Sequence, residues 1–182
     1  MNKDTYYELL INNFEELPMK AKILILENDC FNRDFLSDIS CYLSSANINS
    51  PIEIIFLVAF YIYTKGSIYI NPQERIEIGN KVYYADFSIS FDYFVNNFFN
   101  EDFKLVIECD GYEFHQKTKE QVDNDNQREY DLKMQGYNVL RFSGREIFKY
   151  PMQCIEKLID YLRLKAYPEN KAKSGETNEW NK

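Results

Sequence analysis

The sequence predicts an α/β (α+β) fold in which helices flank a mixed β-sheet and an N-terminal helical extension precedes it. Three observations support this prediction. Hydrophobic residues recur at helical spacing near the start of the chain, and alternation typical of strands follows in the middle. A buried strand, a polar helix and a second strand then succeed one another, which is the order of a βαβ unit with parallel strands.

Helical spacing begins near the N-terminus. Hydrophobic side chains at intervals of three and four residues predict a helix from Thr5 to about Leu17, and one or two further helices over 21–26 and 35–43. Pro18 should end the first of them, because proline has no amide hydrogen for a continuing helix. We expect residues 1–48 to form a helical extension that packs on the core.

A stronger helix signal starts at Ser50. The run Ser50-Pro51-Ile52-Glu53 places a serine at the N-cap, a proline in the first turn and a glutamate three residues after the serine. This pattern predicts a helix that opens with a capping box. The helix should extend to about Tyr63, because Gly66 lies just beyond it.

Strand patterns replace the helical spacing from Ser67 onward. Hydrophobic residues alternate over three segments: 68–70, 76–78 and 82–89. Gly79-Asn80 predicts a hairpin turn between two of them. Residues 92–102 are rich in aromatics and asparagine and are interpreted as a loop, after which Lys104 to Asp110 predicts a buried strand.

The C-terminal part completes the βαβ unit. Thr118 and Gln121 predict a capping box for a helix that ends at Gly136, and a strand over 138–142 follows. A last helix should carry the hydrophobic residues from Ile147 to Leu162. We therefore expect one domain over 50–166, and a flexible tail over 168–182, which is polar and has no periodicity.

Composition narrows the class of protein. The 182 residues are 45% hydrophobic, which is enough for one domain with a proper core. No hydrophobic run reaches the roughly 18 to 20 residues of a membrane span, and the first residues do not resemble a signal peptide, so we expect a cytoplasmic protein with no membrane partner. The four scattered cysteines predict reduced, mostly buried thiols. A net charge of -8 weighs against tight binding of nucleic acid through a bulk field.

Acidic residues at the end of the strand from Lys104 form the main candidate site. Glu108 and Asp110 lie two residues apart, so in a strand they point to the same face. Burying two like charges is costly without a positive partner, and Asp86 adds a carboxylate from an upstream strand. Hard oxygen ligands favour Mg²⁺ or Mn²⁺, and the only histidine, His115, is close in the sequence.

The same acidic residues also have ordinary structural interpretations. A capping box explains Glu53 without catalysis, and Asp110-Gly111 is typical of a turn. Asp86, in an alternating strand, fits a residue that faces solvent. A lone histidine such as His115 is more often structural than catalytic.

Basic residues gather in the same half of the chain as the carboxylates: Lys117, Lys119, Arg128, Lys133, Arg141, Arg145 and Lys149. For scattered lysines and arginines, a solvated face is the more common explanation. The helix over 118–135 carries one stripe of four residues: Gln121, Asp125, Arg128 and Leu132. Because this stripe joins polar residues to one that should be buried, we expect the helix to lie over the site, with Arg128 facing phosphate or the carboxylates.

The chain resembles the small restriction-endonuclease-like proteins related to the very-short-patch repair endonuclease, a branch of the PD-(D/E)XK nuclease superfamily. The resemblance covers roughly Ser50 to Leu162. It rests on an ordered series of residues: Asp86, Ile107-Glu108-Cys109-Asp110-Gly111, Phe114-His115-Gln116-Lys117, Asp125, Gln127-Arg128 and Gly136-Tyr137-Asn138-Val139-Leu140-Arg141-Phe142. It implies a restriction-endonuclease-like mixed sheet flanked by helices, and Mg²⁺-dependent hydrolysis of phosphodiester bonds in DNA.

The resemblance also implies roles for individual residues. Asp86 and Glu108 would ligate the metal, together with Glu53 from the preceding helix and the backbone carbonyl of Cys109. Asp110 occupies the position where the superfamily usually has lysine, a departure that relatives of this branch share.

Without that lysine, the positive charge and the proton transfer must come from other side chains. His115 matches the histidine after the Asp-Gly turn, and Arg128 matches a basic residue on the following helix. Lys117 is the third candidate.

Two classes of function follow. The first is a metal-dependent endonuclease acting on DNA, alone, as a homodimer or with a loading partner. The same residues would serve a nuclease acting on RNA, so the sequence leaves that substrate open. The second is a non-catalytic module of the same fold that binds nucleic acid or a protein, and whose acidic charge would favour a basic partner.

Overall fold

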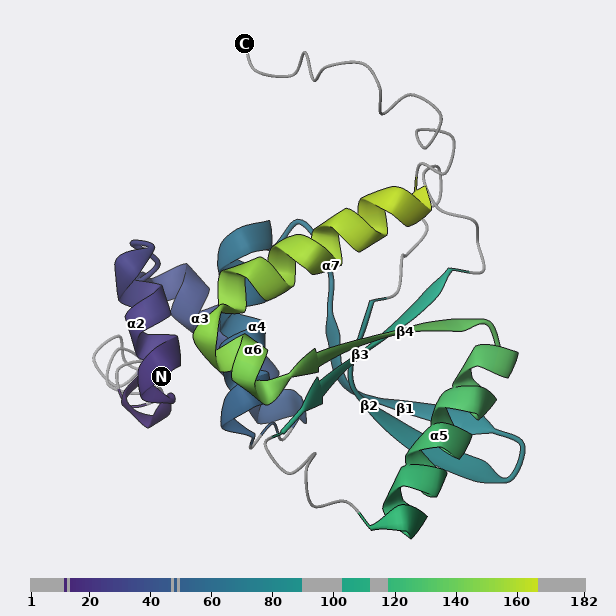
Figure 1. Ribbon diagram of the computed structural model, residues 1–182. Coiled ribbons are helices and arrows are strands. Elements are labelled where there is room, and N and C mark those ends of the chain that lie inside the picture. The colour runs from purple at the N-terminus through teal and green to yellow at the C-terminus, as the bar shows by residue number, and fades with distance from the viewer. Residues whose placement is uncertain are drawn as a thin grey trace.

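The computed structural model describes residues 12, 14–46, 48, 50–89, 103–111 and 118–166. Figure 1 shows a sheet with helices on both faces. The elements in chain order are α2 (Met19–Glu27), α3 (Arg33–Ala46), α4 (Pro51–Thr64), β1 (Asn71–Ile78), β2 (Lys81–Ile89), β3 (Lys104–Asp110), α5 (Lys119–Met134), β4 (Tyr137–Ser143), α6 (Gly144–Lys149) and α7 (Pro151–Ala166). The predicted α+β class is confirmed.

The four strands form one mixed sheet in the order β1-β2-β3-β4. β1 and β2 are an antiparallel hairpin that turns at residues 79–80, as predicted, and β3 runs antiparallel to β2. β3 and β4 are parallel, as expected for the strands of a βαβ unit. The sheet therefore places the end of β3 in the middle of the fold, between β2 and β4.

Helix α4 fills the main core, which lies on one face of the sheet. Its sequence is almost entirely hydrophobic, as befits a helix that is covered on several sides. The ring of Phe56 lies 5.4 Å from that of Phe87 on β2 and 5.5 Å from that of Phe142 on β4. α2, α3, α6 and α7 pack against α4, and Figure 1 shows α4, α6 and α7 together on this side. This packing fixes the N-terminal turn of α4, with Glu53, against the sheet.

Among the described helices, α5 is the one that covers the opposite face of the sheet. A small hydrophobic cluster holds it there: Ile76, Ala85, Val106 and Leu132. Its first turn has the predicted capping box, in which the Thr118 side chain accepts from the Gln121 amide and the Gln121 side chain accepts from the Thr118 amide. Gln121 is thereby assigned to the cap, so the predicted polar stripe contributes Arg128 and Leu132 to the interior but not Gln121.

Three expectations about element boundaries are wrong. The first strand begins at Asn71, so 68–70 precede it. The side chain of Ser50 makes no capping hydrogen bond, although Ser50 is the N-cap of α4. The expected last helix is two helices, α6 and α7, which are separated at Tyr150. Pro151 explains this break, because proline disfavours helical dihedrals in the residue before it.

Other expectations lie outside the described residues. These are most of the helix from Thr5 to Leu17, the loop over 92–102 and the tail over 168–182. All four cysteines are free thiols, of which Cys109 and Cys154 are buried. Among the helices in the described ranges, none is both long enough and apolar enough to cross a membrane.

Candidate nuclease site

The strands β2 and β3 bring Asp86 and Glu108 together. The antiparallel pairing of Phe87 with Ile107 leads, one step along the ladder, to Asp86 facing Glu108. The Asp86 Oδ2 atom accepts a hydrogen bond of 2.7 Å from the amide of Cys109. Glu108 is only 4% exposed, so a carboxylate is buried at the end of a core strand. Buried carboxylates are rare unless they are paired or bind a metal.

Helix α4 contributes Glu53 to the same region. The Gln73 side-chain amide donates a hydrogen bond of 2.8 Å to Glu53 Oε2. Gln73 has a φ of 51°, and the pairing of β1 with β2 passes over it, from Pro72 to Glu74. This local break in the strand turns Gln73 toward α4. Glu53 is therefore bound to the sheet, whereas the predicted capping box would have left it on the helix end.

Two arginines face the carboxylates from the other elements. Arg128 on α5 donates from an NH2 atom to Glu108 Oε1 at 2.7 Å and also to the carbonyl of Tyr84. Arg141 on β4 lies with NH1 3.4 Å from Asp110 Oδ1, and with Nε 3.3 Å from Glu129 Oε2.

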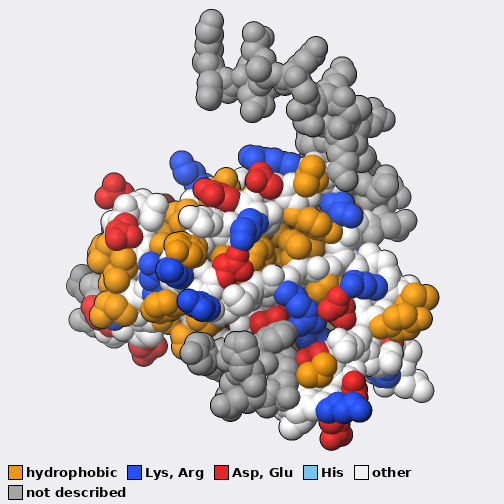
Figure 2. All heavy atoms as spheres, viewed as in Figure 1, with side chains coloured by type: hydrophobic (Ala, Val, Ile, Leu, Met, Phe, Trp, Pro, Cys, Tyr) orange, Lys and Arg blue, Asp and Glu red, His pale blue; other side chains and the backbone are white. Residues whose placement is uncertain are grey.

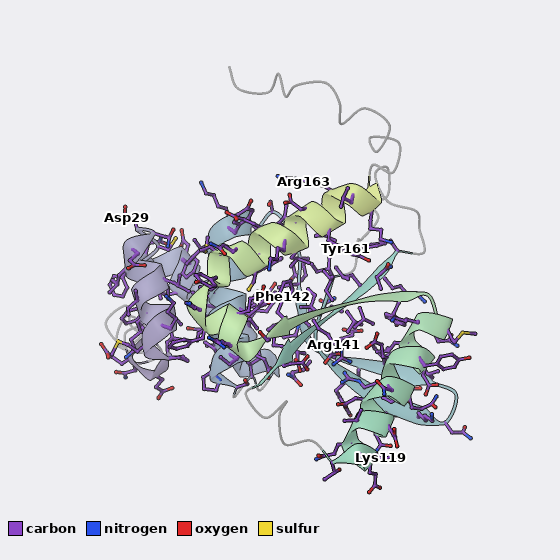
Figure 3. All side chains as sticks on the ribbon, in the orientation of Figure 1. Asp29, Lys119, Arg141, Phe142, Tyr161 and Arg163 are labelled. Carbon is purple, nitrogen blue, oxygen red and sulfur yellow. The ribbon has the colours of Figure 1, made fainter. Side chains whose placement is uncertain are left out.

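Arg141 is less well satisfied than Arg128. The Nε atom of Arg141 is buried and has no partner in hydrogen-bond geometry, although Glu129 lies within ion-pair distance. Figure 3 shows Arg141 on the α5 side of β4, whereas Phe142 points to the side of α6 and α7. Alternation along β4 therefore directs a cation toward the carboxylates and an aromatic ring into the core.

The carboxyl groups influence one another electrostatically. Burial raises the pKa of Glu108 to about 7, with a further contribution from the charge of Asp86 and an opposing one from Arg128. Burial also raises the pKa of Asp86, and the hydrogen bond from Cys109 opposes this. The pKa of Glu53 is raised by burial and then by the charge of Asp86, while hydrogen bonds from Gln73 and Ser50 lower it. The cluster is therefore short of positive charge.

The chemistry of Glu53, Asp86 and Glu108 fits a divalent cation, because buried and half-buried carboxylates with raised pKa values gain from a hard cation between them. Their present arrangement is not a closed ligand set. In the part of the chain that the structure describes, no group of three or more His, Cys, Asp or Glu side chains is positioned to hold a metal ion. Glu53 and Glu108 are instead engaged with Gln73 and Arg128.

The structure thus brings most of the predicted site residues together: Glu53, Asp86, Glu108, Asp110 and Arg128. His115 and Lys117 lie outside the described residues. The backbone amide of Cys109 contributes to the site by donating a hydrogen bond to Asp86. A role for its carbonyl as a metal ligand stays a prediction.

Sequence reasoning missed two contributors. Gln73 carries no sequence signal, because its role depends on a local change in backbone conformation. For Arg141, the sequence indicates membership of the basic group and of the motif series, but no role in the site. Alignment of the two parallel strands would have identified it, since Arg141 pairs in register with Glu108.

The comparison with known families agrees with this geometry. A restriction endonuclease-like family model, REase_MTES_1575, matches residues 72–162, which is half of the chain. The chain belongs to this family. The match includes Asp86, Glu108, Asp110 and Arg128, while Glu53 lies before it. No curated protein and no solved structure matches the chain significantly. Membership supports a nuclease-type module, and it makes the buried carboxylates the place to look for the chemistry.

Proposed function

We propose that the protein is an endonuclease that hydrolyses phosphodiester bonds in DNA with the help of Mg²⁺ or Mn²⁺. The observation that carries this proposal is the half-buried carboxylate of Asp86 beside the buried carboxylate of Glu108, at the centre of a restriction endonuclease-like sheet. Structural residues at this position would be expected to be hydrophobic. Two neighbouring carboxylates with raised pKa values are what a cation site needs before the cation arrives.

In this proposal, the cation is held by Asp86, Glu108 and Glu53, with the Cys109 carbonyl as a further ligand. When bound, such a cation would polarise a phosphate and lower the pKa of a water molecule. Binding competes with the contacts that Glu53 and Glu108 now make, so we expect both side chains to change partners on loading.

The chain's own cations have separate roles in the proposal. Arg128 now forms an ion pair with Glu108, and in the proposal it would contact a phosphate when that carboxylate binds a cation instead. Arg141 holds Asp110 and supplies positive charge where the superfamily usually has a lysine. Proton transfer by His115 or Lys117 remains part of the proposal. Cleavage would leave a 5′-phosphate if the protein follows the very-short-patch repair branch that it resembles.

The acidic net charge shapes how substrate is bound. With a charge of -8, the protein should bind DNA weakly and with strong dependence on salt. A second copy of the chain or a loading protein would compensate for this. RNA would be cut by the same residues, so the substrate has to be determined by experiment.

The test compares plasmid, linear duplex and single-stranded DNA, together with RNA, in Mg²⁺, Mn²⁺ or EDTA. We expect metal-dependent cutting that falls by at least about 100-fold in Asp86→Asn and in Glu108→Gln, since each change removes a charged ligand. Glu156→Gln, an exposed change on α7, is the matched control and should cut normally. Calorimetry with Mn²⁺ should show binding that Asp86→Asn weakens.

One observation favours the second function, a non-catalytic binding module. Glu108 already has a satisfied ion pair with Arg128, and no three-residue metal group is formed among the described residues. If the protein neither cuts nor binds Mn²⁺, while Asp86→Asn leaves binding of nucleic acid or protein unchanged, the nuclease proposal fails and the binding module replaces it.

A further inference from the structure

A hydrophobic hollow of about 450 Å³ opens beside α6, outside the carboxylate cluster. Its walls come from the first turn of α4 and from α6: Ile52, Gly144, Arg145, Phe148 and Lys149. Phe148 is 57% exposed, although a large aromatic side chain is usually covered. An exposed ring at the mouth of a hollow is suited to stack on a flat ligand.

The hollow adjoins the end of β3. A Cβ atom on Gly144 would lie 3.0 Å from the carbonyl oxygen of Asp110 and 3.5 Å from Ile52 Cγ1. Glycine therefore lets the start of α6 approach the strand end closely. Ile52 and Glu53 both belong to the first turn of α4, so this turn contributes to the wall of the hollow and to the carboxylate cluster.

The hollow is flanked by cations without acidic partners. Arg145 and Lys149 are exposed, and neither forms an ion pair with any residue that the structure describes. The two arginines of the site, Arg128 and Arg141, are by contrast paired with carboxylates. Figure 2 shows Lys and Arg side chains next to hydrophobic ones over the region of α6. Lys149 lies over the ring of Tyr150 at 4.9 Å, so its charge is not neutralised. Cations without acidic partners around an apolar surface attract an anion with an apolar part.

We propose that this hollow binds one unpaired nucleotide of the substrate strand. The base stacks on Phe148 above Ile52, and the adjoining phosphates are held by Arg145 and Lys149. This inference rests on the proposed function and names its substrate class. Bases in an intact duplex are stacked on their neighbours and cannot offer a face to Phe148. The preferred substrates are therefore forked, bulged or single-stranded nucleic acids whose unpaired nucleotide lies beside the scissile phosphate.

The test uses binding in EDTA, so that it does not depend on cleavage. The probe is a duplex with one bulged 2-aminopurine, whose fluorescence falls when the base stacks on an aromatic ring. We expect quenching by the native protein and its loss in Phe148→Ala, with binding weakened by about 5- to 100-fold, the range for the loss of one base stack. Phe148→Tyr keeps a ring and should keep the quenching.

Matched controls separate the hollow from general effects. Phe31→Ala removes another exposed ring, which does not line the hollow, and should leave the quenching unchanged. Arg145→Ala with Lys149→Ala should weaken binding and lower its salt dependence, whereas Arg163→Ala on α7 should not. Figure 3 places Arg163 near the far end of α7.

Three results would overturn the inference: quenching that survives Phe148→Ala, equal affinity for the bulged and the perfect duplex, or preference for an acidic peptide over the oligonucleotide. Failure of this inference and failure of the nuclease proposal can be told apart, because the binding test needs no cleavage. Cleavage without quenching would support the nuclease proposal and reject the hollow as a nucleotide-binding site. Quenching without metal-dependent cutting would retain the nucleotide site on a non-catalytic protein.

Discussion

At the scale of single residues, Glu108 shows how the site is balanced. It is buried at the end of a hydrophobic strand, and Arg128 supplies one cation at 2.7 Å. One ion pair does not offset its burial and the neighbouring negative charge of Asp86, since its pKa is raised to about 7. Keeping Glu108 charged therefore lowers the stability of the folded protein. Such a cost is expected for a residue that serves function rather than stability.

This balance predicts how stability depends on pH. Below about pH 4.5, Glu108 is protonated in both folded and unfolded chains. Between there and pH 7 the folded protein keeps a proton that the unfolded chain has lost, so the free energy of unfolding falls as pH rises. Without metal, Glu108→Gln should remove about 2–3 kcal/mol of this fall.

Urea denaturation in EDTA at pH 5 and pH 8 measures the effect. At pH 8 the native protein should have a lower free energy of unfolding than Glu108→Gln. At pH 5 the free energies of unfolding of these two proteins should be closer. Glu156→Gln, which alters an exposed carboxylate, serves as the control. An equally steep fall in Glu108→Gln would show that Glu108 is not the group that titrates.

At the scale of elements, α5 is the part of the site with the weakest attachment. Leu132 is its one buried residue, and polar contacts provide the remaining attachment, including Asp131 with Lys81 at 2.6 Å. Arg128 depends on this helix for its position. We therefore expect α5 to open more easily than α4, which is embedded in the main core.

A substitution at the helix cap tests this expectation. Thr118→Ala removes the hydrogen bond to the Gln121 amide, and should lower the free energy of unfolding by about 1 kcal/mol. Amide hydrogen exchange should accelerate in α5 while α4 keeps its protection. Ser143→Ala, which removes a similar cap from α6, is the comparison and should leave exchange in α5 unchanged. Uniform acceleration across all helices would contradict local opening.

The elements also show what the sequence could predict. The helices at Ser50 and Thr118, the hairpin at residues 79–80 and the parallel pair β3 and β4 follow from local patterns, and all are confirmed. The site residues on those elements could be selected because two carboxylates end a hydrophobic run. Contacts between distant segments could not be predicted, such as Gln73 with Glu53, because they depend on backbone geometry that no pattern encodes.

At the scale of the whole molecule, the segment that matches the family begins later in the chain than the segment that forms the hydrophobic core. The match begins at residue 72, yet α4 places eight buried residues in the core and supplies Glu53. The fully buried rings of Phe56 and Phe60 are each worth about 1.5–3 kcal/mol, in a domain whose total stability is about 5–15 kcal/mol. The matched segment alone therefore has less than a complete core.

We predict that a chain without residues 1–66 does not fold cooperatively. Circular dichroism and thermal melting would show this as the absence of a sharp transition. Removal of residues 167–182 is the comparison, because their sequence predicts no packed element, and it should leave the transition in place. A cooperative transition in the chain without residues 1–66 would mean that the remaining residues form a complete core of their own.

The buried position of Cys109 makes the alkylation of its thiol a measure of how often the sheet opens at the site. Its thiol is buried on β3 beside the carboxylates, and burial raises its pKa well above the usual value, so it should resist alkylating reagents while the strand stays in place. Cys41 is exposed and should react first, which calibrates the reagent within the same molecule. The rate at which Cys109 reacts, relative to Cys41, would then report how often the sheet opens at the site, without any attached label.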